Sequence, residues 1–137
     1  MKKQLNLLGL GLLLMSALAY ADTVTMKVNI PFSFNVGKAT MPAGEYSVRG
    51  LGPEGNVISI RNSDKAEYSL TLALACQSLK TPEQSKLVFH RYGDRYFLAQ
   101  IWTAGKNWGR EFPKSRRETE MALDYQVQKV VLLASLR

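Results

Sequence analysis

The sequence contains few of the residue types that build cross-links or reactive centres. Its 137 residues include one cysteine, Cys76, and one histidine, His90. A single cysteine excludes a disulfide within the chain, and one histidine with one distant cysteine cannot supply the three or four ligands that a zinc ion usually needs. We therefore predict no metal site and no cofactor. Cys76 follows Leu74 and Ala75, and in this apolar stretch we expect a buried, unreactive thiol.

Catalytic motifs are missing as well. No Gly-x-Ser-x-Gly sequence accompanies His90, and Gly50-Leu51-Gly52 is followed by Pro53 and a predicted strand, whereas a phosphate-binding loop leads into a helix. The glutamates mostly fall in or beside predicted turns, so no pair of carboxylates suited to glycoside hydrolysis stands out. We therefore assign no catalytic residue from motifs.

Residues 1–21 have the pattern of a secretory signal peptide. Two lysines precede an apolar run over residues 5–18, and Ala19-Tyr20-Ala21 provides the small residues that signal peptidase accepts. An uncleaved membrane anchor is the alternative, but the apolar run is rather short for the roughly 20 residues that span a bilayer. We predict cleavage, export to the periplasm or the extracellular space, and no transmembrane segment in the remaining chain.

Removal of residues 1–21 leaves residues 22–137 as one β-rich domain of a size that can fold without a metal or a disulfide. This domain carries sixteen basic and eleven acidic residues, a net charge of +5. A positive surface favours anionic surroundings, such as lipid headgroups, envelope polymers or nucleic acid. Because export argues against nucleic acid, we expect the partner to be an anionic envelope polymer or a small ligand.

Apolar and polar residues alternate with a period of two along most of this domain, which is typical of half-buried strands. We expect strands in residues 24–30, 32–36, 45–49, 56–61, 68–74 and 127–136. The cleanest alternation runs from Tyr68 to Leu74, and Ala73 and Ala75 on its opposite side leave room for close packing.

The best-defined unit is a hairpin over residues 86–103, closed by Gly93-Asp94. Glycine at the first position of a two-residue loop suits a type II′ turn, and this turn pairs Tyr92 with Arg95. One face then carries Leu87, Phe89, Arg91, Tyr96, Leu98 and Trp102. The other face carries Val88, His90, Tyr92, Phe97, Ala99 and Ile101. Since both faces are largely apolar, we expect a central hairpin that is covered on two sides.

One helix is predicted near the C-terminus. Ser115 and Glu118 form a capping box, in which the serine oxygen accepts a backbone N–H and the glutamate reaches back to the cap. The helix should run to about Leu123 and lie on the surface, because most of its residues are polar. These patterns predict a mainly β fold: a single antiparallel β-sandwich or small β-barrel of about 7–9 strands, with one short C-terminal surface helix before the last strand.

Three stretches together resemble a family of small exported bacterial proteins that are rich in β-structure and have no established function. The first is IPFSFNVG at 30–37 with MPAGEYSV at 41–48, the second is LVFHRYGDRYFL at 87–98 with IW at 101–102, and the third is GREFPKS at 109–115. The resemblance covers nearly the whole domain. It implies an exported β-rich domain, and it implies no reaction, ligand or catalytic residue.

The strongest candidate for a ligand site is the segment 103–117 with the strand end before it, where aromatic and cationic residues are interleaved. We expect four residues to contact a ligand: Trp102, Lys106, Trp108 and Arg110. Aromatic rings stack on sugars or bases while cations meet anionic groups. The alternative is a loop whose Trp108 and Phe112 cover the end of the sheet while the charges stay in water.

Two hypotheses about function follow from these patterns. The first is an exported, non-enzymatic protein that binds a ligand or an envelope component at one end of the β-structure. The second is a small exported enzyme, similar to a hydrolase or an isomerase, in which His90, Arg91 and Tyr92 would have to converge on a pocket. The alternative role for His90 is structural: an imidazole packed across from Phe97 and hydrogen-bonded at one nitrogen.

Overall fold

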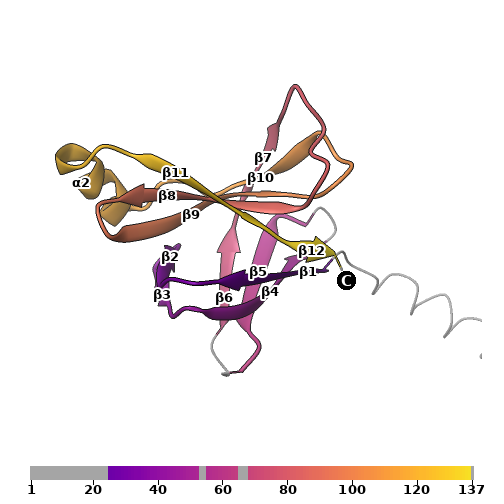
Figure 1. Cartoon of the computed structure of the whole chain (residues 1–137), viewed down its shortest axis with the longest axis horizontal. Coiled ribbons are helices and arrows are strands. Elements are labelled where there is room, and N and C mark those ends of the chain that lie inside the picture. Colours follow the sequence, from indigo (N-terminus) through magenta and orange to yellow (C-terminus); the bar gives the residue numbers. More distant parts are fainter. Residues whose placement is uncertain (1–24, 53–54, 65–67, 137) are drawn as a thin grey trace, which may run out of the picture.

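The computed structural model describes residues 25–52, 55–64 and 68–136 (Figure 1). The predicted signal peptide, residues 1–21, lies outside the described residues. In these ranges strands dominate the fold, and they form two sheets with one short helix, α2 (Arg116–Asp124), before the last two strands. None of the described helices is long and apolar enough to cross a membrane.

Twelve strands are present in the described ranges. Sheet A has the spatial order β12 (Ser135–Leu136), β1 (Thr25–Ile30), β4 (Gly44–Leu51), β5 (Val57–Asn62) and β6 (Tyr68–Leu72). Sheet B has the order β11 (Gln128–Leu133), β8 (Lys86–Tyr92), β9 (Arg95–Trp102), β10 (Trp108–Glu111) and β7 (Leu74–Gln77). A small hairpin of β2 (Phe34–Val36) and β3 (Ala39–Met41) joins sheet B through a parallel pair of Asn35 with Phe97.

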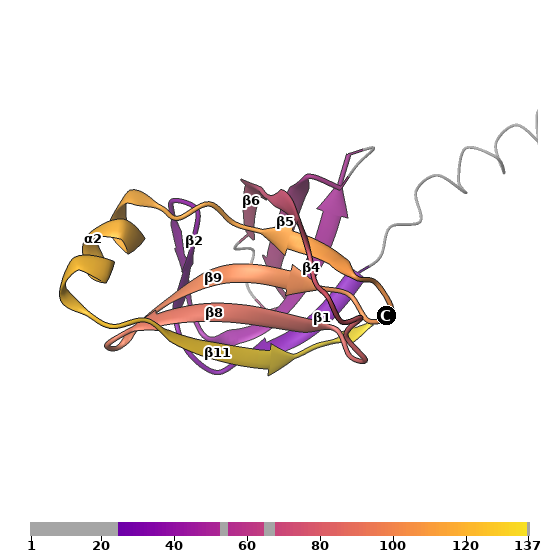
Figure 2. The same ribbon diagram turned by 90° about the horizontal axis from the view of Figure 1, so that it is seen from above.

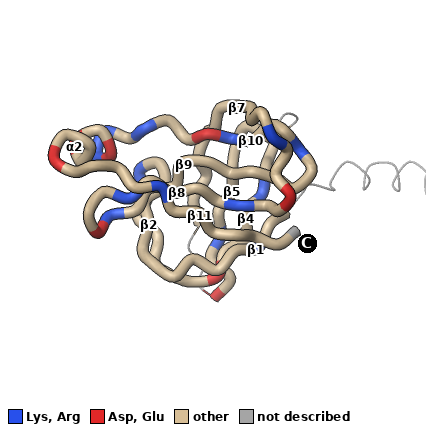
Figure 3. Tube along the Cα trace, turned by 45° about the horizontal axis from the view of Figure 1, so that its top comes forward, with Lys and Arg blue, Asp and Glu red and all other residues tan. Residues whose placement is uncertain are grey.

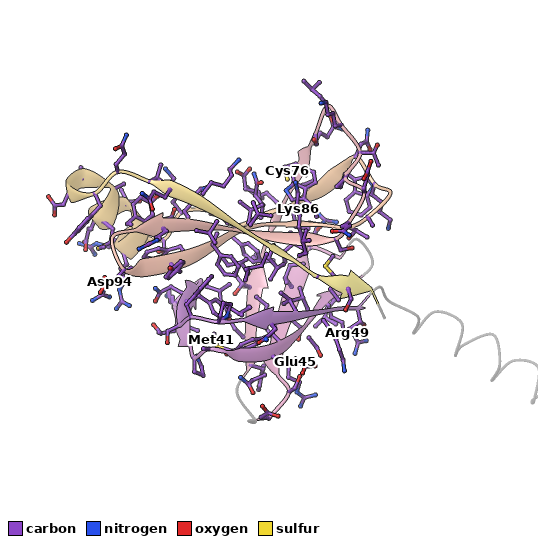
Figure 4. All side chains as sticks on the ribbon, viewed as in Figure 1. Met41, Glu45, Arg49, Cys76, Lys86 and Asp94 are labelled. Carbon is purple, nitrogen blue, oxygen red and sulfur yellow. The ribbon has the colours of Figure 1, made fainter. Side chains whose placement is uncertain are left out.

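The two sheets face each other as the layers of a β-sandwich (Figures 1 and 2). Apolar side chains from both layers meet between them, and the side chains drawn in Figure 4 fill this space. The predicted fold class is therefore confirmed. More strands are found than expected because β3 and β10 were not predicted and because two expected strands are each divided, one into β6 and β7 and the other into β11 and β12.

An aromatic cluster connects the two layers. Phe34 on β2 makes edge-to-face contacts with Tyr46 of sheet A and Phe89 of sheet B, with ring centroids 5.2 and 5.6 Å apart. Phe32 stacks on Tyr96 at 3.7 Å. Phe34, Tyr46 and Phe89 are fully buried, and such pairs contribute about 0.5–1.5 kcal/mol each beyond the area they bury. Phe34, the first residue of β2, therefore holds the two sheets together.

The consecutive strands β6 and β7 belong to different sheets, and the chain passes from one sheet to the other at Ala73. Its backbone N–H donates to Asn56 O at 2.8 Å, and the side chain is buried. The predicted alternation is present, but its apolar row faces away from the core. The exposed fractions of the four large side chains are 61% for Tyr68, 55% for Leu70, 68% for Leu72 and 63% for Leu74. Ser69, by contrast, is buried. The small side chain of Ala73 lets the two sheets approach each other closely at the crossing. The larger side chains on either side of it therefore point outward.

The hairpin of β8 and β9 has the predicted register, including Tyr92 opposite Arg95 and His90 opposite Phe97. The predicted assignment of side chains to the two faces of the hairpin is correct only between the turn and a β-bulge. The register shifts between Val88 and Phe89, and a bulge moves the residues beyond it to the opposite side. Ile101 consequently lies in the core between the sheets. Trp102 lies on the other face, so the expected positions of these two residues were wrong.

The helix α2 begins as predicted but uses its glutamate differently. The Ser115 side chain accepts a hydrogen bond from the Glu118 N–H at 3.1 Å, which makes Ser115 the N-cap. The Glu118 side chain does not complete the predicted capping box. It is instead the one buried residue of the helix and contacts sheet B. The rest of α2 is mostly exposed, which confirms a surface helix.

We predict that Gly93→Val lowers the free energy of unfolding by about 1–3 kcal/mol. Gly93 has a φ of 63°, and an added Cβ would lie 3.1 Å from Tyr125 Cε1. A β-branched residue is strained at such a φ. Gly105→Val is the control for backbone strain alone, since its φ is 81° and no atom lies within 4 Å of the added Cβ. Denaturant unfolding measures both, and equal stability of Gly93→Val and wild type would contradict the turn assignment.

Candidate functional site

Three of the four residues predicted to contact a ligand lie together at the start of β10. Lys106 Nζ is 4.9 Å and Arg110 Cζ is 5.4 Å from the centre of the Trp108 ring. The Trp108 side chain is 42% exposed, so it does not cover the end of the sheet as the alternative required. We call these three residues the Trp108 cluster. Its two cations already interact with the ring, and Arg110 also donates to Asn56 Oδ1 at 3.0 Å.

The fourth residue, Trp102, is held in the body of the domain. It is 7% exposed, and its indole Nε1 donates to Gln100 Oε1 at 3.0 Å. Its ring packs against Gly109, where an added Cβ would come within 2.7 Å of the ring. Trp108 and Arg110 flank Gly109 along the strand and therefore point to the opposite face. The structure thus separates Trp102 from the Trp108 cluster.

A buried carboxylate connects α2 to the outer face of sheet B. Glu118, 4% exposed, places Oε2 2.9 Å from the Tyr92 hydroxyl and 3.1 Å from His90 Nδ1. We call these three residues the Glu118 cluster. His90 and Tyr92 are two positions apart on β8 and share one face of the sheet, as the hairpin register predicts. Both were candidates in the enzyme hypothesis, and their partner was not.

Arg91, the third residue of the predicted pocket, does not join them. It lies between His90 and Tyr92 in the strand and so faces the other way. Its Nε donates to the Gly93 carbonyl at 2.7 Å, and its guanidinium lies 5.5 Å from the centre of the Tyr96 ring. The structure therefore brings together two of the three residues that were required to converge.

In the Glu118 cluster, the carboxylate is placed so that it orients the His90 ring. Burial and the hydrogen bond to the Glu118 carboxylate raise the pKa of Tyr92 from 10 to about 12, so its hydroxyl stays a donor in neutral solution. One carboxylate oxygen then accepts from the phenol and contacts the imidazole. Such a carboxylate fixes the ring orientation of a histidine, as it does in catalytic pairs, and in this fold it also fastens α2 to the sheet.

The third location was not predicted as a site. A cleft of about 930 Å³ lies between the edge strand β6, the β2–β3 hairpin and the segment 113–117 that leads into α2. Four cations line it: Lys38, Lys114, Arg116 and Arg117. None of the described residues that line it is Asp or Glu. We call it the cationic cleft, and Figure 3 shows basic positions along the chain between β10 and α2.

The interior of the cationic cleft combines apolar and polar groups. Phe97, 3% exposed, lies at its base on β9, and Ser69, Thr71 and Asn35 offer hydrogen-bonding side chains. Asn35 is held in place, because its Nδ2 donates to Tyr96 O at 3.1 Å and its Oδ1 accepts from Arg117 at 3.4 Å. The cleft can therefore take a ligand with negative charges, an apolar part and hydrogen-bonding groups.

A second hollow, of about 900 Å³, has a different electrostatic character. Lys27 and Glu45 line it and form an ion pair of 3.7 Å, and Asp64 and Glu83 add further negative charge. Since charges of both signs are present, this hollow does not select a ligand by its sign. The lining of neither hollow includes any of the residues of the Glu118 cluster.

Reactive and metal-binding groups contribute little to these sites. Cys76 is a free thiol that is half-buried, in contrast to the expected full burial. Partial burial and the nearby Glu111 carboxylate raise its pKa, so the thiol stays protonated at neutral pH. No group of three or more His, Cys, Asp or Glu residues that could hold a metal ion occurs in the described part of the chain.

Two functional candidates were missed for identifiable reasons. The sequence predicts only a capping role for Glu118, because no local pattern connects it to His90, 28 residues earlier. The cationic cleft uses Lys38 together with Lys114 and Arg117, which lie more than 70 positions away in the sequence. The excess of cations in the segment 103–117 was a usable signal, but it pointed to the opposite end of the segment.

We predict that stability declines between about pH 10 and pH 12 and that Tyr92→Phe reduces this decline. The pKa of Tyr92 is raised in the folded state, so above pH 10 the unfolded chain loses the phenolic proton first and unfolding becomes easier. Urea unfolding at a series of pH values measures the effect. The exposed Tyr68→Phe is the matched control and should keep the wild-type decline. Equal pH dependence in wild type and Tyr92→Phe would contradict the assignment.

Comparisons with known proteins leave the site to be interpreted from its own geometry. Family models, curated proteins and solved structures were compared with the chain. No match was found in any of the three comparisons.

Proposed function

We propose that this protein is an exported, non-enzymatic binding domain whose ligand is anionic and occupies the cationic cleft. The observation that carries the proposal is the composition of the cleft lining, which holds Lys38, Lys114, Arg116 and Arg117 and no described carboxylate. A cleft lined by charges of one sign concentrates ligands of the opposite sign and speeds their association.

The strength of these contacts limits the kind of ligand. An exposed ion pair contributes about 0.2–1 kcal/mol. Arg116 already pairs with Glu120 at 3.5 Å, so the other three cations together contribute about 0.6–3 kcal/mol, which corresponds to an affinity weaker than millimolar. Useful binding therefore needs additional contacts. The cleft offers them in the buried Phe97 ring, in the exposed Leu70 and Leu72, and in the hydroxyls of Ser69 and Thr71.

Export is supported by the sequence. The leader over residues 1–21 and the resemblance to small exported bacterial proteins both favour a location outside the cytoplasm. In that compartment, acidic polymers, anionic lipid headgroups and acidic protein segments are the abundant partners for a positively charged domain.

The Glu118 cluster supports an enzyme only weakly. Its carboxylate orients His90, which a general base would need, and the imidazole is 26% exposed. However, the same carboxylate oxygen is also occupied by Tyr92, and Arg91 faces the opposite side of the sheet. A role in fastening α2, whose first residues line the cationic cleft, accounts for both contacts of the Glu118 carboxylate.

We predict that Lys38→Gln with Lys114→Gln weakens the binding of an anionic probe by about 2- to 30-fold, because two surface ion pairs are lost. The probes are polyglutamate and a sulfated oligosaccharide, and isothermal titration calorimetry at low salt measures their affinity. The matched control is Lys80→Gln with Lys129→Gln, which removes the same charge from two exposed positions outside the cleft. This control should bind within about twofold of wild type.

Two results would contradict the assignment. If both double variants lose affinity equally, only the net charge matters and no site exists in the cleft. If Trp108→Ala weakens binding more than the cleft variant does, the ligand contacts the Trp108 cluster, as the sequence predicted. The two places are distinguishable because Trp108 pairs with Gln77, at the end of β7 away from β6, whereas residues of β6 line the cleft.

A further inference from the structure

We propose that the ligand of the cationic cleft is an extended, acidic peptide segment that pairs with the free edge of β6 as an added strand. This inference rests on the proposed function and names the chemical class of its ligand. It depends on three features of the cleft: the backbone groups of β6 that face it, the composition of that strand, and the charge of the surrounding side chains.

Among the described residues, the backbone of β6 has hydrogen-bonding groups that do not pair with β5 and that face the cleft. Within the described residues β6 pairs only with β5 and forms one edge of sheet A. Ala73 N–H donates to Asn56 O, and the same register pairs Thr71 with Ile58. Bonding pairs alternate along an antiparallel ladder, so the N–H and C=O groups of Leu70 and Leu72 point away from β5. Both residues line the cleft.

The edge has few of the features that normally prevent strand addition, although the β2–β3 turn contacts β6 at Thr71, where a Cβ added to Gly37 would lie 3.1 Å from Thr71 Oγ1. Natural proteins protect exposed edges with charged residues, proline, bulges or a covering segment. The strand β6 reads Tyr-Ser-Leu-Thr-Leu, without a charge or a proline, and its ladder with β5 is regular. Leu70 and Leu72 are more than half exposed. An added strand would give these side chains an apolar neighbour, which is how cross-strand pairs stabilise a sheet.

The charge of the cleft selects the partner. Lys114, Arg116 and Arg117 come from one segment and Lys38 from the β2–β3 turn, so cations are present on the walls that face β6. A peptide lying along β6 would direct alternate side chains to this wall, and acidic side chains there would meet the cations. Edge-strand recognition by peptides works in this way, with affinity from the backbone and specificity from alternate side chains.

A second copy of the chain is a poorer occupant of the same edge. Pairing two β6 strands would bring two sets of Lys38, Lys114, Arg116 and Arg117 close together, and like charges across an interface oppose association. Residues 22–137 carry a net charge of +5, which adds to this repulsion. The charge therefore favours an acidic partner over self-association.

The test uses hexapeptides of alternating glutamate and valine, capped at both ends and labelled for fluorescence anisotropy. Binding should weaken at least about tenfold when glutamine replaces glutamate, because the charges are lost. Two further peptides carry N-methyl groups on the glutamates or on the valines. An added strand bonds through alternate residues, so one of these peptides should keep its affinity and the other should lose it. Equal effects of the two N-methylated peptides would overturn the pairing with β6.

Variants of the protein test the same contact from the other side. Leu70→Pro removes the N–H that faces the cleft without removing a bond to β5, and proline is tolerated at such edge positions. Leu70→Ser is the matched control, since it removes the leucine side chain but keeps the N–H. We expect Leu70→Pro to bind the glutamate–valine peptide at least about tenfold more weakly than Leu70→Ser, and equal affinities would contradict the inference. Thermal unfolding of both variants verifies that they fold.

The outcomes separate this inference from the proposed function. If polyglutamate or the sulfated oligosaccharide binds in a Lys38- and Lys114-dependent manner while neither the N-methyl pattern nor Leu70→Pro has an effect, the cleft binds anions but does not pair with a strand. If none of the anionic probes binds, the proposed function and the inference fall together. Concentration-dependent dimerisation that Leu70→Pro abolishes, seen by sedimentation without peptide, would assign the edge to a second copy.

Discussion

The contact of Phe34 with Tyr46 and Phe89 is the constraint on which the arrangement of the two sheets depends. One ring from a three-residue strand touches a fully buried aromatic side chain in each layer. Because Phe34 is anchored in both directions, β2 cannot move independently of either sheet, and its neighbour Asn35 is fixed against β9. The β2–β3 turn that carries Lys38 is thereby positioned opposite β6. The wall of the cationic cleft is thus a by-product of core packing.

Local pattern predicted the elements of this fold better than it predicted their orientation. A period of two locates a strand, but it does not say which face meets the core when both faces can be accommodated. The row from Tyr68 to Leu74 illustrates this, because Ala73 at the crossing is buried, whereas Ala75, expected to pack closely beside it, is exposed. The bulge in the β8–β9 hairpin has a similar effect on Ile101 and Trp102. Neither the crossing nor the bulge has a strong local signature.

The candidate sites show the same division between local and distant information. His90 and Tyr92 are two positions apart in one strand and therefore share a face, so their proximity follows from the sequence. Their partner Glu118 comes from a helix whose docking depends on tertiary structure, and its local role as a capping residue was a reasonable but incomplete interpretation. The cationic cleft is assembled from four separate segments. No single one of them carries a motif, and only the packed structure brings their charges together.

The uncharged edge of β6 has a consequence for the physical behaviour of the protein in solution. An apolar, unprotected strand edge favours contact between molecules, whereas the positive charge keeps the molecules apart. The range of that repulsion shrinks to about 10 Å at 0.1 M ionic strength and to about 3 Å at 1 M. Colloidal stability is therefore an electrostatic property of this chain, and ionic strength sets how concentrated a solution it tolerates before the strand edges meet.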